Sequence, residues 1–359
     1  MNRLDRRVQC HFDYLIPLLL LPVIVTSVWL VYEINPSLAY KQIGYIAVSF
    51  VLAGLLFLLP LRKLIWIAPI LYWIDILLLI SVKFFGISIL GAKRWLEIPL
   101  IGLTIQPSEI MKPALILMLA YLIQKNPPPD EGYDLKEFLR IGSYILIPFI
   151  LIVIEPDLGS ATVILLLGFF VLFIMGVRWK IWATLAALFL LSSTLIYDNL
   201  RPYQQQRIKD FLSEKPSYHV QQSIITIGSG GLFGKEKEEA TQTQLKFLPI
   251  ATSDFIFAYH VERFGFWGAF LLLGIYFLLI IHLFTLSQKT RDDPLSTVLA
   301  LSVGALFFIY VSVNVMMTIG LAPVVGIPLP MFSVGGSSFI NFMILLTILE
   351  NFIAFRYNF

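Results

Sequence analysis

Long apolar runs recur along nearly the whole chain, with short polar segments between them. None of these runs alternates apolar and polar residues with a period of two, so they predict helices rather than the strands of a barrel. Their lengths lie at or somewhat below the roughly 20 residues with which a helix crosses a bilayer, so tilted or broken helices are expected. Ten runs can be distinguished, near residues 12–31, 43–60, 64–81, 109–124, 142–155, 160–177, 180–197, 266–286, 296–320 and 335–355.

The longest interval between runs, residues 198–265, separates the seventh run from the eighth. We therefore expect an all-α integral membrane protein, in which residues 1–359 form a single polytopic bundle of about ten transmembrane helices with one large extracytoplasmic loop. Composition agrees, because 58% hydrophobic residues, 14% charged residues and a mean hydropathy of +0.83 lie outside the range of soluble domains.

The lysines and arginines set the expected orientation of the bundle. If the N-terminus is inside, thirteen of them fall on the inner side and four in the short outer loops. This bias predicts that both termini are cytoplasmic and that the 198–265 loop faces outward. The inner residues are Arg3, Arg6, Arg7, Arg62, Lys63, Lys125, Lys136, Arg140, Arg178, Lys180, Lys289, Arg291 and Arg356, and the outer ones are Lys41, Lys83, Lys93 and Arg94.

Other features exclude further classes of protein. A single cysteine, Cys10, cannot form an internal disulfide and provides no cluster for zinc or for iron and sulfur. The formal net charge of +3 is too small and too dispersed to indicate a nucleic-acid partner. The basic residues before the first run resemble the start of a signal peptide, but Ser37 to Ala39 is a poor cleavage site beyond a full-length span.

Charged residues within the apolar runs need a partner, because each would cost roughly 2.5–3.5 kcal/mol at a helix centre. Glu109 and Lys112 are three residues apart on one helical face, so each can neutralise the other while lining an outward cavity. The alternative is an ion pair that only holds helices together. Asp75 and Glu350 are better explained as interfacial or packing charges.

Two segments between runs combine turn residues with carboxylates. Ser108 stands between Pro107 and Glu109, a pattern that predicts a helix start with Ser108 as its cap. Residues 155–160 are typical of a tight outward turn in which Asp157 can cap the sixth helix. A pore-facing or catalytic Asp157 is the other interpretation.

The long loop carries the densest polar chemistry. Its glycine-rich run at 227–235 would let backbone amides approach an anion, but it lacks the ending of a nucleotide-binding P-loop. A flexible linker and a site for a phosphorylated lipid head group are both open interpretations of this run.

One carboxylate in this loop stands out chemically. Asp254 is flanked by apolar residues at the mouth of the eighth helix, where its proton affinity should be raised. Such a group is a candidate general base, with a helix cap or a surface charge as the alternatives.

Six motifs, taken in order, resemble those of the SEDS family of bacterial cell-wall proteins, which includes RodA, FtsW and SpoVE. The resemblance covers nearly the whole chain, and the short N-terminus and missing C-terminal tail look more like RodA, the elongation member. The motifs are GAKRWL at 91–96, QPSEIMKP at 106–113, PDLGSA at 156–161, the glycine run at 228–234, DFIFA at 254–258, and PLP at 328–330 followed by GGSS at 335–338.

The resemblance implies a peptidoglycan glycosyltransferase that polymerises lipid II outside the bacterial cytoplasmic membrane, for cell elongation and rod shape. It also implies a class B penicillin-binding protein as the crosslinking partner, within the elongation machinery. The family's catalytic aspartate falls on Asp254, which would take the proton of the acceptor hydroxyl as the donor's pyrophosphate leaves. Glu109 and Lys112 match the family's paired charges in a central cavity, and Asp157 matches its outward aspartate.

The leaving pyrophosphate needs positive charge nearby. The outward candidates are Lys93, Arg94, Lys112 and Arg207. A divalent cation, magnesium or manganese, is a candidate helper, although no set of metal ligands can be named. The chain departs from the family pattern at Ile250 and Arg263, where the family usually has acids. The first change removes a potential metal ligand, and the second is expected to alter only local loop pairing.

Two other functions would also suit a helical bundle with charges inside. A transporter that flips lipid II or another polyprenyl-linked sugar could use a charged central cavity, but no clear inverted repeat is present. A non-catalytic scaffold of the elongation machinery would leave Asp254 unexplained. The sequence therefore favours the polymerase.

Overall fold

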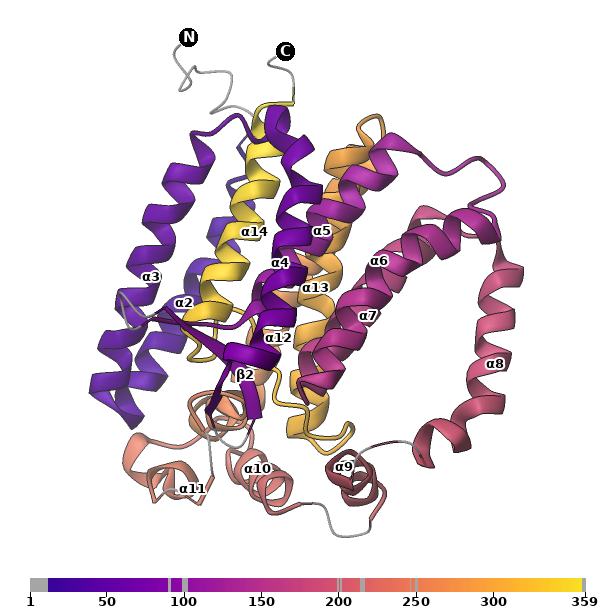
Figure 1. Ribbon diagram of the computed structural model, residues 1–359. Coiled ribbons are helices and arrows are strands. Elements are labelled where there is room, and N and C mark those ends of the chain that lie inside the picture. Colours follow the sequence, from indigo (N-terminus) through magenta and orange to yellow (C-terminus); the bar gives the residue numbers. More distant parts are fainter. Residues whose placement is uncertain are drawn as a thin grey trace.

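The computed structural model is a bundle of long helices (Figure 1). It describes residues 12–89, 92–98, 103–198, 200, 202–213, 217–245, 247–248 and 251–356. Each of the ten predicted runs corresponds to one long helix, which confirms the all-α membrane fold. The helices are α2 (Leu15–Ile34), α3 (Pro36–Phe57), α4 (Ala68–Phe85, preceded by the 3₁₀ helix η1, Leu61–Ile67), α5 (Pro107–Lys125), α6 (Leu135–Ile154), α7 (Leu158–Met175), α8 (Trp179–Asp198), α12 (Ile256–Lys289), α13 (Pro294–Thr318) and α14 (Gly336–Ala354).

Eight helices among the described residues are long and apolar enough to cross a membrane. The other two long helices are α5, which carries three charged residues, and α8, whose apolar part is shorter. Helix α12 begins at residue 256 but is broken at Gly265, where φ is +66°, so the eighth predicted run, which starts at 266, matches the part of α12 after the break. The part of α12 before the break, residues 256–264, was not predicted, because its polar side chains interrupt the apolar pattern; Tyr259 and Arg263 are paired within the protein.

The predicted long loop contains helices of its own. These are α9 (Pro202–Leu212), α10 (Tyr218–Ser229), the 3₁₀ helix η2 (Lys237–Glu239) and α11 (Thr241–Gln244). A small antiparallel sheet, which the sequence did not predict, joins α4 to α5, with strands β1 (Ile87–Ile89), β2 (Ala92–Ile98) and β3 (Leu103–Ile105) in the order β1-β2-β3. Both additions lie at the same end of the bundle (Figure 1).

The opposite end of the bundle holds the first and last described residues. The ring of Phe12 packs edge-on against Phe57 at 5.9 Å between centroids, and Phe57 in turn packs against Phe355 at 5.6 Å. An even number of crossings returns a chain to the side from which it started, so this arrangement agrees with a ten-helix bundle. We call this the terminal end, and the end with the loop helices and the sheet the loop end.

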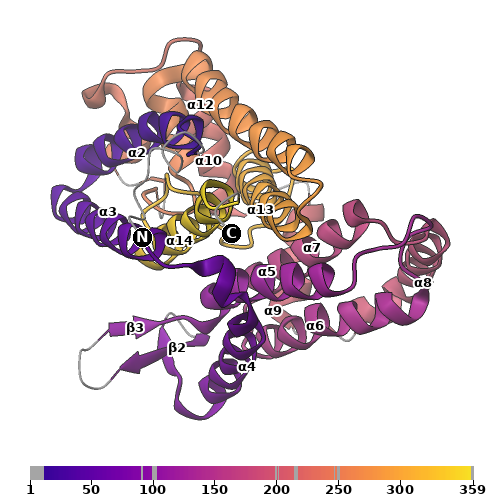
Figure 2. The ribbon, with the colours of Figure 1, turned by 90° about the horizontal axis from the view of Figure 1, so that it is seen from above.

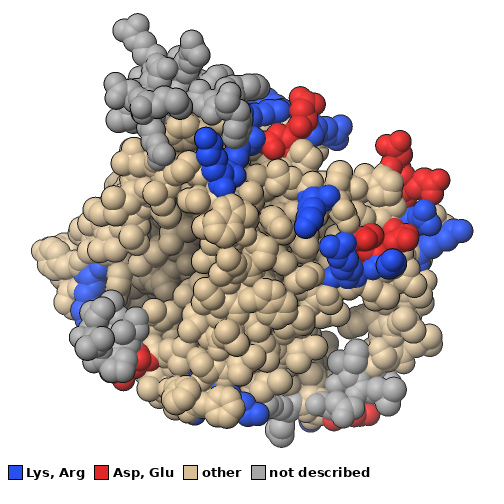
Figure 3. Space-filling view, turned by 45° about the horizontal axis from the view of Figure 1, so that its top comes forward, with Lys and Arg blue, Asp and Glu red and all other residues tan. Residues whose placement is uncertain are grey.

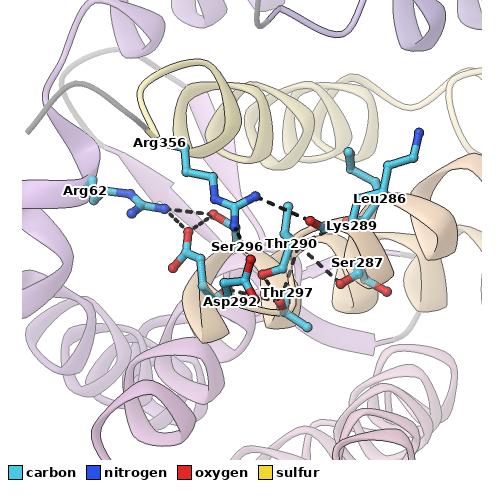
Figure 4. A network of polar contacts seen from close by, with 10 residues as sticks. Arg62, Leu286, Ser287, Lys289, Thr290, Asp292, Ser296, Thr297 and Arg356 are labelled. Atoms are coloured by element: carbon cyan, nitrogen blue, oxygen red, sulfur yellow. Dashed lines mark hydrogen bonds and ion pairs between the residues drawn. The ribbon is translucent and has the colours of Figure 1, made fainter.

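A polar network closes the terminal end (Figure 4). Arg62, at the start of η1, pairs with Asp293 and donates to Ser296 Oγ at 2.9 Å. Arg356, just after α14, donates to the carbonyl oxygen of Lys289 at 3.4 Å. On the face shown in Figure 3, charged side chains gather toward the two ends and a broad uncharged surface lies between them, as a membrane requires.

Helix α13 forms the centre of the bundle, and 78% of the residues in its most apolar stretch are buried. It packs against α5, α7, α12 and α14, which surround it when the molecule is viewed along the helices (Figure 2). Helix α8 lies at the outer edge, where Leu190 and Leu191 are 72% and 80% exposed. The core therefore positions α5, which carries Glu109 and Lys112, and the starts of α7 and α12, which directly follow Asp157 and the turn that contains Asp254.

Candidate active site

Asp254 lies at the loop end, in a turn formed by residues 251–255 immediately before α12. Its carboxyl group is partly buried, and Ser253 Oγ donates to Asp254 Oδ1 at 2.8 Å. The N-cap of α12 is Phe255 and has no side-chain cap, so the interpretation of Asp254 as a helix cap is wrong. The group is available for another role.

Burial raises the pKa of the Asp254 carboxyl above its usual value. The hydrogen bond from Ser253 and the positive charge of Arg207 oppose this shift, but burial is the larger effect. The direction agrees with the raised proton affinity expected from the sequence. A carboxylate with raised proton affinity is a better base than an exposed one.

A long proline- and glycine-rich segment forms hydrogen bonds with the backbone of this turn. We call residues 320–335 the proline segment. Within it, Ser333 Oγ donates to the carbonyl oxygen of Ser253 at 2.7 Å, and the amide of Val334 donates to that of Thr252 at 2.9 Å. A Cβ atom at Gly326 would lie 3.5 Å from Asp254 Oδ2, so this glycine borders the carboxylate directly. The residues that flank and join the two parts of the sixth motif, 328–330 and 335–338, therefore hold the turn that carries Asp254.

The sequence did not identify Asn314 as part of this arrangement. Asn314 comes from α13 and is fully buried, and its side-chain amide donates to the carbonyl oxygens of Asp254 at 3.0 Å and Ile327 at 2.7 Å. The available signal was a single asparagine in a helix without charged residues, since a buried amide needs partners.

Arg207 is brought to Asp254 by helix α9, and its positive charge acts on the carboxyl. It is also one of the residues that line a small cavity beside Pro323 and Val324 of the proline segment. Arg207 is thus the one predicted pyrophosphate-binding cation that the described structure places next to the predicted base.

Asp157 forms a second cluster, in the turn between α6 and α7. Its Oδ1 accepts from the amide of Ser160 at 3.3 Å, which confirms the predicted helix cap. Its Oδ2 accepts from Gln106 Nε2 at 3.0 Å and from Ser108 Oγ at 3.3 Å. Ser108 therefore does not cap α5, contrary to the prediction, because its hydroxyl is drawn to a buried carboxylate on the neighbouring turn.

Two of the predicted cations have protein partners. Arg94 Nη1 lies 3.6 Å from Asp157 Oδ1, and Arg94 also donates to the carbonyl oxygen of Pro156. Lys93 Nζ donates to the carbonyl oxygens of Lys83 at 3.0 Å and Phe84 at 3.3 Å, and so caps the end of α4. The positive charge of both side chains was readable from the sequence, but the carbonyls that they meet were not.

Glu109 and Lys112 form the ion pair predicted from their spacing. Lys112 is only 3% exposed and also bonds to the hydroxyl of Tyr310 on α13, over whose ring it lies at 5.1 Å. The pair therefore links α5 to α13, as the interpretation of a helix-holding ion pair expected. A role in binding substrate stays a prediction.

The two clusters meet through the proline segment. A Cβ atom at Gly159, in the first turn of α7, would lie 2.6 Å from the carbonyl oxygen of Val325. The next residue, Gly326, borders Asp254. The Asp157 turn and the Asp254 turn thus contact two consecutive residues of one segment, so a displacement of either turn would reach the other.

Two further acids lie in the protein interior. Asp75 on α4 is 1% exposed and Glu350 on α14 is 5% exposed, so both are packing charges rather than interfacial ones. Glu155, in the turn before Asp157, is 7% exposed, and burial raises its pKa to about 8, with repulsion from Asp157 adding to the shift. The positive charge of Arg94 opposes this rise.

The glycine run at 227–235 is not a free linker, because it packs against α12, while a site for a phosphorylated lipid head group stays an open interpretation. Its backbone packs against α12 at Gly265, where φ is +66° and the helix is broken. A Cβ atom at Gly265 would lie 2.4 Å from the amide nitrogen of Gly234. The amides of Gly234 and Lys235 donate to the carbonyl oxygens of Gly230 at 2.8 Å and Glu262 at 3.0 Å, so they are already occupied.

The departure from the family pattern at Arg263 has a clear partner. Arg263 makes a two-pronged ion pair with Glu33 at the end of α2, with nitrogen to oxygen distances of 2.8 and 2.9 Å. Tyr259 also donates to Glu33 at 2.7 Å. This agrees with altered local pairing, although the sequence did not identify Glu33. The other departure, Ile250, lies outside the described residues, as does Cys10.

The sequence suggested a divalent cation as a candidate but no residues that would bind it. Within the ranges that the structure describes, no group of three or more histidine, cysteine, aspartate and glutamate side chains is arranged to hold a metal ion.

Comparisons with known proteins agree with these motifs. Residues 9–358 match the family model FTSW_RODA_SPOVE, described as cell cycle protein. The Helicobacter pylori (strain ATCC 700392 / 26695) protein named peptidoglycan glycosyltransferase MrdB is 53% identical over 356 residues, which cover 99% of this chain and 93% of that protein. The Escherichia coli (strain K12) protein of the same name is 36% identical over 93% of this chain and 91% of that protein.

Solved structures show the same fold. One chain, from a structure described as "Structural coordination of polymerization and crosslinking by a peptidoglycan synthase complex", has a TM-score of 0.84 and 29% identity, covering 97% of this chain and 99% of that one. The Thermus thermophilus rod shape determining protein RodA has a TM-score of 0.72 and 28% identity, covering 96% of this chain and 98% of that one.

Proposed function

The chain belongs to the FtsW/RodA/SpoVE family, and from this premise we propose that it polymerises lipid II into glycan strands with Asp254 as the general base. It is a peptidoglycan glycosyltransferase and a multi-pass membrane protein that acts in cell-wall synthesis and cell shape. The observation that supports the assignment of the base is the partly buried carboxyl of Asp254, held at the loop end with a raised pKa.

Glycosyl transfer with inversion needs one base. As an acceptor sugar hydroxyl attacks the anomeric carbon of the donor, its proton passes to the Asp254 carboxylate, and the bond from the anomeric carbon to the pyrophosphate oxygen breaks. The lipid pyrophosphate leaves with the bonding electrons. The protonated Asp254 then returns its proton to water. The anchored backbone of this turn keeps the carboxylate in place during the step.

The departing pyrophosphate gains negative charge, and Arg207 is the cation that we assign to it. The electrostatic effect of Arg207 on Asp254 supports this assignment. The side chains of Lys93, Arg94 and Lys112 are held by carbonyl or carboxylate oxygens. Each would have to leave a protein partner before it could bind a phosphate.

The site would face outward and the termini the cytoplasm, because thirteen basic residues fall on one side of the predicted topology and four on the other. The crosslinking partner would be a class B penicillin-binding protein. Support comes from the 0.84 TM-score to a chain of a peptidoglycan synthase complex whose description joins polymerisation with crosslinking.

The test is polymerisation of purified lipid II by the detergent-solubilised protein together with its penicillin-binding partner. We expect Asp254→Ala and Asp254→Asn to abolish glycan strands while lipid II binding is retained, because only the proton acceptor is lost. Glu238→Gln is the matched control, since Glu238 is an exposed acid of η2 at the same end of the molecule. It should polymerise at the native rate.

Equal strand formation by the native protein and both Asp254 variants would remove Asp254 from the mechanism. If no variant and no native protein makes strands, but lipid II crosses vesicles that contain the native protein, the function is transport of lipid II.

A further inference from the structure

A large apolar groove lies far from the candidate active site, at the terminal end of the bundle. It has a volume of about 770 Å³ and is formed by α2, α3 and α14, which lie side by side in Figures 1 and 2. Its wall is built from side chains such as Leu20, Ile24, Phe50, Phe57 and Met343. Its volume falls within the range of roughly 300–1,000 Å³ that is usual for sites that bind small ligands.

The groove opens sideways toward the membrane. Leu18 and Leu21, which line it from α2, are 66% and 61% exposed in the absence of lipid. Since the helices that form it cross the bilayer, the medium at its mouth is hydrocarbon. An apolar chain from the membrane can therefore enter without passing through water.

Among the described residues that line the groove, one carries an ionisable carboxyl group. Glu350 lines the groove and is 5% exposed, and its Oε2 accepts from the amide of Asp13 at 3.2 Å. Its Oε1 has no hydrogen-bond partner among the described residues. A buried carboxyl oxygen without a partner is costly, and more so in hydrocarbon. The groove therefore combines a long apolar surface with one unmet acceptor.

The charge around Glu350 restricts what can meet it. The nearest acid is Asp13, whose Oδ2 lies 2.5 Å from His282 Nε2. A second carboxylate so close disfavours an anionic head group and favours a cationic donor. Among membrane lipids, a primary ammonium has N–H donors, whereas a trimethylated ammonium has none.

We propose that this groove binds one zwitterionic phospholipid with a primary ammonium head group, phosphatidylethanolamine in its chemical class. The ammonium donates to Glu350 Oε1, and one acyl chain lies between α2 and α3. The site belongs to the leaflet at the terminal end, and nothing in the polymerisation chemistry requires it.

The inner end of the groove reaches the segment that supports the active site. Met331 lines the groove, is 2% exposed, and has φ of +57°, a conformation that is strained for a side chain with a Cβ atom. Two residues later, Ser333 holds the carbonyl oxygen of Ser253. A chain in the groove would pack against Met331 and help to keep the proline segment in this conformation.

Two glycines of α3 allow a matched test. A Cβ atom would meet nothing within 4 Å at either Gly54 or Gly44, so a larger side chain is tolerated at both. Gly54 lines the groove and Gly44 does not. Gly54→Phe should fill the groove with a ring, whereas Gly44→Phe should only add a ring to the outer surface of the same helix.

The experiment is native mass spectrometry of the full chain released from vesicles of equal phosphatidylethanolamine and phosphatidylcholine. The native protein should retain one phosphatidylethanolamine with about tenfold preference over phosphatidylcholine, the ratio expected for one charge-assisted hydrogen bond. Gly54→Phe should lose that lipid, and Gly44→Phe should keep it. Glu350→Gln should keep a lipid but lose most of the preference.

Several results would overturn the proposal. Equal lipid retention by Gly54→Phe and Gly44→Phe would show that the lipid binds elsewhere. Equal retention of both lipids by the native protein would remove the ammonium contact with Glu350. If the native protein carries a second copy of the chain or a partner's helix, and the Gly54→Phe variant does not, a protein fills the groove instead.

Discussion

The side-chain amide of Asn314 bonds to the main-chain carbonyl oxygen of Asp254 at 3.0 Å, across 60 residues of sequence. The same amide bonds to Ile327 at 2.7 Å, so one buried group on α13 fixes both the turn that carries the carboxylate and the segment that borders it. This geometry makes Asn314 a positioning residue rather than a catalytic one.

Asn314→Leu should therefore lower kcat for polymerisation by roughly 10- to 100-fold, with little change in KM for lipid II, because a shift of the carboxylate slows the chemical step. It should also lower the free energy of unfolding by about 1–3 kcal/mol, since two buried carbonyls lose a donor. Steady-state kinetics and thermal unfolding at equal folded amounts measure the two effects.

Ser302→Ala is the control for this substitution, because Ser302 lies on the same helix and is equally buried. Its kinetics should match those of the native protein. A folded Asn314→Leu protein with native kcat would show that these hydrogen bonds do not position the base.

The pH dependence of the reaction follows from the raised pKa of Asp254. The base works only when it is deprotonated, so log kcat/KM should fall as the pH is lowered through a pKa above the usual value of 3.8 for aspartate. Arg207 opposes that rise, so Arg207→Gln should move the acidic limb of the profile to still higher pH.

The control is Lys209→Gln, which removes an exposed positive charge from the same helix, α9. It should leave the acidic limb in place. An acidic limb that stays fixed in Arg207→Gln, or that persists in Asp254→Asn, would assign the titration to another group.

The ionisation of Asp254 also makes the stability of the protein depend on pH, with the opposite sign from that of a salt-bridged aspartate. Because the folded pKa of Asp254 is raised, its contribution to the stability is fully present below the unfolded pKa and is lost as the pH rises through the folded value. Catalysis and stability therefore make opposite demands on this carboxyl, which is a common cost of an active site.

The sequence was sufficient to predict the ten helices because lipid imposes a strong local rule. A backbone that crosses hydrocarbon must satisfy its own hydrogen bonds, so each span leaves a long apolar run. The sheet of residues 87–105 lies at the loop end and follows no such rule, and its three short strands were missed. The part of α12 before its break, residues 256–264, was missed for the related reason that its polar side chains find partners far away in the chain.

The candidate site was predicted by motif and only partly by physics. The spacing of Glu109 and Lys112 gave their ion pair, because neighbours on one helix have a fixed geometry. The contacts of Asn314 and Glu33 join residues 60 and 230 positions apart, and no local pattern encodes such distances. Charges could be read from the sequence, but their partners required the fold.

The break in α12 also required the fold, and it leads to a test of the glycine run. Gly265→Ala would place a methyl group 2.4 Å from the amide nitrogen of Gly234 and would force a non-glycine residue to φ of +66°. We expect a loss of about 1–3 kcal/mol in the free energy of unfolding. Thermal unfolding in detergent measures it.

Gly274→Ala lies on the same helix, where a Cβ atom would meet nothing within 4 Å. It should be neutral, or stabilising by about 0.5–1 kcal/mol, since alanine favours a helix over glycine. If both alanine variants unfold at the native temperature, the close packing of the glycine run on α12 does not contribute to stability.

The ion pair between Arg263 and Glu33 should be strongly coupled, because their side chains are only 11% and 8% exposed. Removing one partner leaves the other charge buried and unpaired, so Glu33→Gln and Arg263→Gln should each cost about 3–5 kcal/mol, while the double variant should cost clearly less than their sum. The comparison pair is Glu137 with Arg140, an ion pair on one helix at 29% and 48% exposure, where the same cycle should give no more than about 0.5 kcal/mol.

Thermal or denaturant unfolding of the four proteins in each cycle supplies the coupling energies. Additive losses at positions 33 and 263 would mean that the two-pronged contact contributes nothing beyond its separate residues, and α2 would then be held to the loop end by Tyr259 and by packing alone.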